Sequence, residues 1–247
     1  MDSQRPESYA AAYHDVYTFI KAADPAARVG PGGVIEPTPL RLQYLDMVLA
    51  SYQTLYGVDL PADFWATHVQ ILQERRGDWG AGIPQGINED SGRTYTIQDN
   101  ADPAVFEQMI RDLRGWMAQR GMRDKPLIVS EYGVLMPSLY LCYCSDRAIG
   151  DQMAIAFMEH TFGFLLSARD DRLGYPADEN RLVQRWSWYS LNEKPYDVEP
   201  WGEGYNGGLF DWRIRQFPGA LTAFGRAFAA YTFDLRATNR IWFPSIF

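Results

Sequence analysis

One segment of the sequence, Pro126-Leu-Ile-Val-Ser-Glu-Tyr132, limits the possible folds more than any other. It is β-branched and apolar almost throughout, which is typical of a parallel strand that is covered on both faces. An ionised carboxylate in the middle of such a strand would lose its hydration. Glu131 is therefore expected at the carboxyl end of the strand, or in an ion pair with a cation such as Arg185. The segment predicts a parallel sheet with a carboxylate at its edge.

Helices and strands alternate along the rest of the chain. Apolar periodicity predicts helices near residues 7–23, 42–55, 102–117, 149–168 and 220–232, and Gly57 is expected to end the second helix. Apolar runs predict strands at residues 27–30, 64–72, 126–132 and 181–189. This alternation implies a parallel sheet, which is either open and doubly wound or closed as a (β/α)8 barrel. No Gly-x-Gly-x-x-Gly turn follows a strand, so a dinucleotide-binding domain has no support.

Size and charge narrow the function classes. A chain of 247 residues, 47% of them apolar, can bury the core of one domain spanning residues 1–247. A net charge of −8 would repel a polyanion, so nucleic acid is not an expected partner. The sequence has no apolar run near 18 residues and no hydrophobic signal core at its start, so it predicts neither a membrane span nor secretion.

Cys142 and Cys144 are predicted to be ordinary thiols, because cysteines two residues apart rarely bridge.

Several motifs, taken in order, resemble those of one superfamily. Ile128-Val-Ser-Glu-Tyr-Gly133 resembles the seventh strand of the clan A retaining glycoside hydrolases, which are (β/α)8 barrels with a nucleophilic Glu at the end of that strand. Residues 9–25 resemble the fourth helix of those enzymes and the approach to strand five, and Trp65-Ala-Thr-His68 resembles strand six. Strand eight and the closing helix are matched by Trp186-Ser-Trp-Tyr-Ser-Leu-Asn192, Asn206-Gly-Gly-Leu-Phe210 and Leu221-Thr-Ala-Phe-Gly225.

The resemblance implies an α/β fold of the TIM-barrel type with about four βα units, the C-terminal half of a barrel. Strands one to four, and the Asn-Glu-Pro type of tripeptide that carries the acid/base in this clan, have no counterpart in the sequence. A half-barrel would have open strand edges, so self-association through those edges is expected. A longer N-terminus would supply the missing half, and a secretion signal would be expected with it.

The implied activity is hydrolysis of O-glycosidic bonds in a polysaccharide or oligosaccharide by a retaining mechanism with two carboxyl groups. Glu131 is the expected nucleophile. Glu36, in the loop after the first predicted strand, is the leading candidate within the chain for the second carboxyl group, with a solvated loop residue as the alternative. Glu74 and Asp211 are weaker candidates. A carbohydrate-binding or scaffold protein that has lost the chemistry is the alternative function.

Aromatic residues make up 15% of the chain, and such a surplus often lines sites for ring-shaped ligands. The side chains expected to contact a sugar are His68, Tyr132, Trp186, Trp188, Trp79, Trp201 and Tyr205. Trp186 and Trp188 have the same parity on their strand, so both point either into a barrel mouth or onto the outer helices. The sequence contains no phosphate loop, His-Glu-x-x-His motif or calcium-loop spacing, so it predicts no cofactor and no metal.

Overall fold

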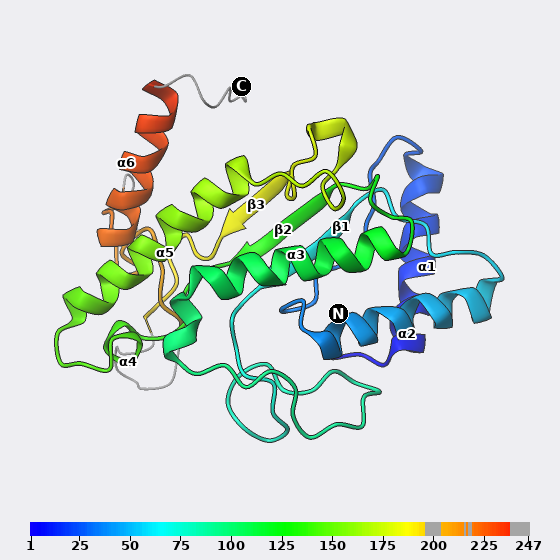
Figure 1. Ribbon diagram of the computed structural model, residues 1–247, viewed down its shortest axis with the longest axis horizontal. Helices are drawn as coiled ribbons and strands as arrows, with labels where there is room; N and C mark the ends of the chain where they lie inside the picture. The colour runs from blue at the N-terminus through cyan, green and yellow to red at the C-terminus, as the bar shows by residue number, and fades with distance from the viewer. Residues whose placement is uncertain (196–203, 215, 217–218, 238–247) are drawn as a thin grey trace.

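The computed structural model describes residues 1–195, 204–214, 216 and 219–237 (Figure 1). One parallel sheet has the strand order β1 (Trp65–Val69), β2 (Leu127–Tyr132) and β3 (Arg185–Trp188). The helices are α1 (Pro6–Ala23), α2 (Pro39–Tyr56), α3 (Pro103–Gln119), α4 (Ser138–Leu141), α5 (Arg147–Ser167) and α6 (Ala223–Ala237), with short 3-10 turns at Gln98–Ala101 and Pro176–Asp178. The predicted α/β class, the parallel sheet and the five long helices are confirmed.

The helix boundaries follow the signals in the sequence. Proline occupies the first turn of α1, α2 and α3, where its missing N–H costs no hydrogen bond. The Asp102 carboxylate accepts a hydrogen bond from the Ala104 N–H and caps α3. Gly57 ends α2 with a φ of 71°, a left-handed conformation that glycine adopts easily, as predicted.

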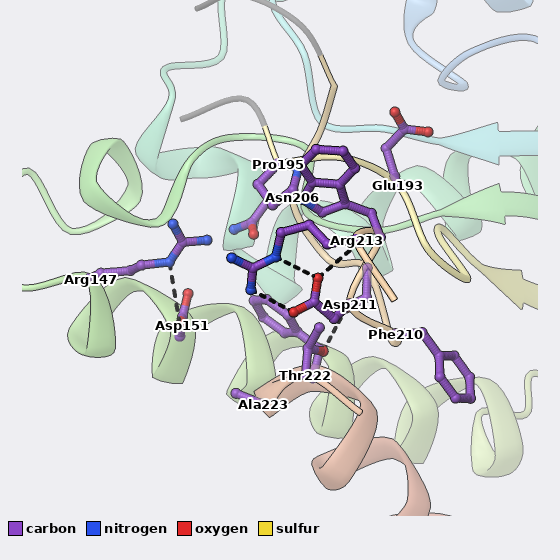
Figure 2. A pocket seen from close by; sticks show the side chains of 13 residues that line it. Arg147, Asp151, Glu193, Pro195, Asn206, Phe210, Asp211, Arg213, Thr222 and Ala223 are labelled. Atoms are coloured by element: carbon purple, nitrogen blue, oxygen red, sulfur yellow. Dashed lines mark hydrogen bonds and ion pairs between the residues drawn. The ribbon is translucent and has the colours of Figure 1, made fainter. Parts of the chain in front are cut away.

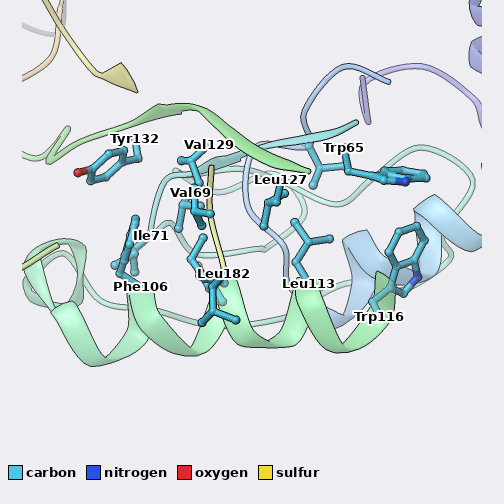
Figure 3. Packing of buried hydrophobic residues seen from close by; sticks show 14 of the residues in the cluster. Trp65, Val69, Ile71, Phe106, Leu113, Trp116, Leu127, Val129, Tyr132 and Leu182 are labelled. Atoms are coloured by element: carbon cyan, nitrogen blue, oxygen red, sulfur yellow. The ribbon is translucent and has the colours of Figure 1, made fainter. Parts of the chain in front are cut away.

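Helices α3 and α5 cover one face of the sheet (Figure 1). The Trp116 ring of α3 packs edge-on against Trp65 of β1 at a centroid distance of 4.9 Å. The Phe162 ring of α5 contacts both Tyr132 and Trp188. Figure 3 shows the inward side chains of β1 and β2 meeting those of α3. The alternate strand side chains, which are half-buried or exposed, are Ala66, His68, Ile128, Ser130, Arg185 and Ser187. The sheet therefore has an apolar face toward the helices and a more polar face away from them.

The strand predicted at residues 27–30 is wrong. Residues 29–35 run beside β1 as irregular chain, where the carbonyl oxygens of Val29, Val34 and Ile35 accept hydrogen bonds from the backbone N–H groups of Asp63, His68 and Gln70. In each of these bonds the residue in or near β1 is the donor. A strand pair needs hydrogen bonds in both directions, and Pro31 has no N–H to donate. The segment is thus attached to β1 without forming a ladder.

The prediction of two free thiols is also wrong. Cys142 and Cys144, between α4 and α5, form a disulfide with a Cα–Cα distance of 5.2 Å. Tyr143 between them has a φ of 48°, in the left-handed region that side chains rarely adopt. This turn brings the two flanking cysteine side chains to the same side of the chain, which the spacing alone does not reveal.

The attachment of residues 29–35 to β1 gives a testable prediction about Gly33. A Cβ on Gly33 would lie 2.8 Å from the Thr67 carbonyl carbon and 2.9 Å from the His68 nitrogen, both backbone atoms. Relief of this clash requires the two segments to separate, so Gly33→Ala should lower the free energy of unfolding by about 1–3 kcal/mol. Urea denaturation followed by circular dichroism measures the loss.

Gly32→Ala is the matched control. Its Cβ would meet only the Tyr9 hydroxyl at 3.6 Å, an ordinary contact. The free energy of unfolding should therefore change by about 0.5 kcal/mol or less. An equal decrease in the free energy of unfolding in the two variants would show that the close approach at Gly33 does not contribute to stability.

Candidate functional site

The carboxyl ends of the parallel strands meet at one edge of the sheet, and Glu131 lies there on the middle strand. Its register partner on β1 is His68. The Glu131 side chain is 37% exposed, and its Oε1 accepts a hydrogen bond of 3.1 Å from the Gln70 Nε2 amide. His68 Nδ1 lies 3.9 Å from the same oxygen. Glu131 is thus at the carboxyl end of its strand, as expected, and its neighbours are an amide and an imidazole.

Tyr189 and Glu193, which follow β3, extend this edge. The Tyr189 hydroxyl donates a hydrogen bond of 3.0 Å to Glu193 Oε2. Burial raises the pKa of Tyr189, and the Glu193 carboxylate and the charge of Glu131 raise it further. Tyr189 therefore stays a neutral hydrogen-bond donor at neutral pH, close enough to Glu131 to sense its charge. Neither residue was among the expected site residues, although Tyr189 directly follows Trp188 and Glu193 lies four residues further on.

Gly133 allows the segments after β2 and β3 to approach each other. A Cβ at this position would lie 2.4 Å from the Tyr189 carbonyl oxygen. A larger residue would push the Tyr189 backbone away from β2, and with it the Tyr189 side chain. Gly133 is therefore a structural requirement of this edge.

Glu36 lies inside the protein and not at an open edge. Its side chain has no exposed area, and its Oε2 accepts a hydrogen bond of 3.1 Å from the Leu72 N–H. Among the residues that the structure describes, its Oε1 has no hydrogen-bond partner, and it lies 3.8 Å from Arg41 Nη1. Burial raises the pKa of Glu36 well above its ordinary value, and the opposing effect of Arg41 is smaller. A fully buried carboxyl group is not placed to meet a sugar, so the expected role of Glu36 as second carboxyl group finds no support in its position.

Arg41 is the cation of a buried cluster that accounts for the state of Glu36. Arg41 Nη1 donates a hydrogen bond to the buried Glu74 carboxylate, which also accepts hydrogen bonds from the Thr38 hydroxyl and the Arg93 N–H. Arg41 Nε donates to Asp2 at 2.6 Å. The guanidinium charge is thus already balanced by closer carboxylates, which is why the effect of Arg41 on the pKa of Glu36 is smaller than that of burial. Glu74, a weaker candidate for the second carboxyl group, is buried in this cluster, and its oxygens accept hydrogen bonds there.

Three of the expected sugar-contacting residues pack toward the helices. Tyr132 has no exposed area, and its hydroxyl is 3.3 Å from Thr161 Oγ1. The Trp188 ring lies 5.4 Å from that of Tyr132, and its Nε1 donates to the Gly207 carbonyl oxygen at 2.9 Å. Trp186 is partly buried against the same core. The shared orientation of the two tryptophans is confirmed, and of the two directions left open they point onto the helices.

The remaining expected contacts lie in loops or on β1. His68 is 32% exposed beside Glu131. Trp79 and Tyr205 are exposed by 37% and 48%. The Tyr205 ring lies 6.1 Å from that of Tyr189, so Tyr205 belongs to the Glu131 edge. Trp201 lies outside the described residues.

A cavity of about 300 Å³ lies next to Glu193, and Glu131 is not among the residues that line it (Figure 2). Its lining comes from α5, the loop after β3 and the start of α6, and includes Arg147, Asp151, Glu193, Asn206, Phe210, Asp211, Trp212, Arg213 and Thr222. Glu193 connects the cavity to Tyr189 through their hydrogen bond. Asp211 pairs with Arg213 at 2.6 Å, and hydrogen bonds from Arg213 lower the pKa of Asp211 to about 2. Asp211, the other weaker candidate, is therefore an ionised group and an unsuitable proton donor.

The buried carboxyl groups generate a prediction about pH. The folded protein holds the Glu36 proton more tightly than the unfolded chain does. The associated stability is complete below the ordinary glutamate pKa and is lost as the pH rises through the folded-state pKa. Glu36→Gln needs no proton and keeps an acceptor for the Leu72 N–H. It should raise the free energy of unfolding at pH 7 by about 1–2 kcal/mol and flatten its pH dependence, as measured by urea denaturation between pH 5 and 8.

Glu74→Gln is the matched comparison. It removes the anion that balances the buried Arg41 charge, so it should lower the free energy of unfolding by about 3 kcal/mol. A loss of stability in both variants at pH 7 would contradict a protonated Glu36.

Comparisons with known proteins assign the chain to no family: no family model matches it, and no curated protein matches it in sequence. Within the described ranges, no three His, Cys, Asp or Glu side chains are grouped to hold a metal ion. The helices of the same ranges include none that is long and apolar enough to span a membrane.

Proposed function

We propose that the chain forms part of a (β/α)8-type barrel that hydrolyses O-glycosidic bonds of a polysaccharide or oligosaccharide, with Glu131 as the nucleophile. The observation that carries the proposal is the position of Glu131: a solvent-reachable carboxylate at the carboxyl end of a parallel strand, with one oxygen oriented by the Gln70 amide. Active sites of (β/α)8 barrels lie at this end of the strands. The helices on one face of the sheet and the polar side chains on the other support the same architecture.

The contacts of Glu131 suit a nucleophile. In a retaining mechanism a carboxylate oxygen attacks the anomeric carbon and the glycosidic C–O bond breaks. The leaving oxygen takes a proton from an acid/base carboxyl group, which in this proposal lies on the rest of the barrel and later accepts a proton from the attacking water. Water then cleaves the glycosyl ester and releases the carboxylate. The Gln70 amide, which carries no charge, orients Glu131, and the Tyr189 hydroxyl after β3 donates its hydrogen bond to Glu193. The amide therefore holds one oxygen of the carboxylate in position.

The cavity beside the edge supports a carbohydrate as the ligand. Phe210 and Trp212 supply aromatic surface, and the charged and amide groups around them supply hydrogen bonds. Sugars present apolar C–H faces and polar hydroxyl edges, so they bind well to this mixture. Its volume of about 300 Å³ is at the lower end of the range for small-molecule sites.

A fluorinated glycoside with an activated leaving group tests the role of Glu131 directly. Fluoride or dinitrophenolate departs without protonation, so the first step needs the nucleophile and no acid. The chain should gain the mass of one fluorosugar, and peptide mapping should place it on Glu131. Glu131→Gln should abolish the labelling, and in the complete barrel it should reduce turnover of an activated aryl glycoside by about 10⁴-fold or more, whereas the 247-residue chain alone should show no turnover.

Glu159→Gln provides the matched control, because Glu159 is an exposed glutamate on α5 and its loss should leave labelling unchanged. A covalent label on a peptide without Glu131, or equal labelling of Glu131→Gln, would end the assignment. Oligosaccharide binding without any label would instead favour a carbohydrate-binding protein that performs no chemistry.

A further inference from the structure

We propose that the Cys142–Cys144 disulfide is a thiol–disulfide exchange site that reacts reversibly with a small external thiol of the glutathione type. These are the two cysteines of the chain, and they bridge across a single residue in the loop between α4 and α5. The proposal does not depend on the glycosidase assignment. It rests on the exposure of the loop, the backbone at Tyr143 and the way the loop is anchored.

The disulfide does little to hold the fold together. A cross-link stabilises a protein mainly by restricting its unfolded chain, and this effect shrinks with the length of the closed loop. Here the loop contains one residue between the two cysteines. A bond with so small a structural contribution can open without unfolding the protein.

Other contacts keep the loop in place when the bond opens. The Ser138 hydroxyl in α4 donates a hydrogen bond to Asp151 in α5. Asn206 Nδ2 donates to Ser138 Oγ at 3.0 Å. Asp146 caps α5 by accepting a hydrogen bond of 2.9 Å from the Ala148 N–H. These contacts involve neither sulfur, so reduction should be a local event.

The disulfide is accessible and its ring is conformationally unfavourable. Tyr143 is 90% exposed, and both cysteines are partly exposed. The φ of 48° at Tyr143 is disfavoured for a residue with a Cβ, and opening the ring would let this backbone relax. Accessible disulfides whose surroundings favour the open form are the labile ones.

The reduced pair is also set up to close again. The cysteines lie just before the N-terminus of the 21-residue helix α5, which Asp146 caps, so the two sulfurs of the reduced pair stay close to each other. A thiolate is the species that attacks a mixed disulfide. The helix end is a supporting feature, and the exposed ring at Tyr143 is the primary one.

The exchange balances with two equivalents of thiol. One external thiolate attacks a cysteine sulfur, the Cys142–Cys144 bond breaks, and the other sulfur leaves as a thiolate and takes up a proton. A second external thiol displaces the first as a disulfide and leaves the second protein thiol. Two external thiols are thus oxidised to one disulfide while the protein pair is reduced, and oxidised glutathione reverses the sequence.

The experiment equilibrates the folded chain with mixtures of reduced and oxidised glutathione, quenches with iodoacetamide and counts alkylated thiols by mass. Because the chain has two cysteines, the mass reports this pair alone. The native protein should pass between zero and two thiols as the glutathione ratio is varied, in both directions. Reduction should change Tm by less than about 3 °C.

Tyr143→Asn tests the cause, because asparagine tolerates the left-handed region better than tyrosine does. It should shift the midpoint about fivefold toward the disulfide. Phe19→Asn, on the exposed side of α1, is the control and should leave the midpoint unchanged. Thiols that appear only after urea is added, a pair that stays reduced in oxidised glutathione, or an unshifted midpoint in Tyr143→Asn would each overturn the proposal.

Discussion

The parallel pairing of β1, β2 and β3 is the constraint on which the rest of the structure depends. Parallel strands all end at the same edge, so three distant chain segments deliver Gln70, Glu131 and Tyr189 to one place. Each connection must also return along the sheet, and α3 and α5 make these returns. Their apolar sides meet Trp65, Tyr132 and Trp188 and form the core. One pairing rule therefore accounts for both the buried face and the polar edge.

Hydrophobic patterns predicted the elements well because they report burial. The five long helices and three of the four strands lie where the patterns placed them. The same reasoning explains why the strand predicted at residues 27–30 is wrong. Val29 and Val34 are buried, but their carbonyl oxygens only accept hydrogen bonds from the β1 side, so the segment forms no strand pair with β1. Burial is visible in the sequence, whereas the direction of backbone hydrogen bonds is not. The same limit applies to Cys142 and Cys144, whose bridge depends on the φ of Tyr143.

The candidate site was predictable in part for a similar reason. The cost of burying a charge fixed Glu131 at the carboxyl end of its strand. The environment of Glu36 depends on Arg41, whose charge is taken by Glu74 and by Asp2, residues 33 and 39 positions away. No local pattern shows such partners. Likewise, strand parity gave Trp186 and Trp188 a common direction, but only the packing of Trp188 against Tyr132 decides which direction that is.

The surroundings of three carboxyl groups, those of Glu36, Asp211 and Glu131, give each of them a different chemical role. Burial raises the pKa of Glu36 despite Arg41 at 3.8 Å, whereas hydrogen bonds from Arg213 lower the pKa of Asp211. Glu131 is reachable from solvent, and its closest polar neighbour is a neutral amide. A guanidinium bonded to both oxygens would hold the lone pairs needed for attack, and full burial would protonate the group. An amide bond to one oxygen does neither, which is why the nucleophile is proposed at Glu131 and at neither of the other two positions.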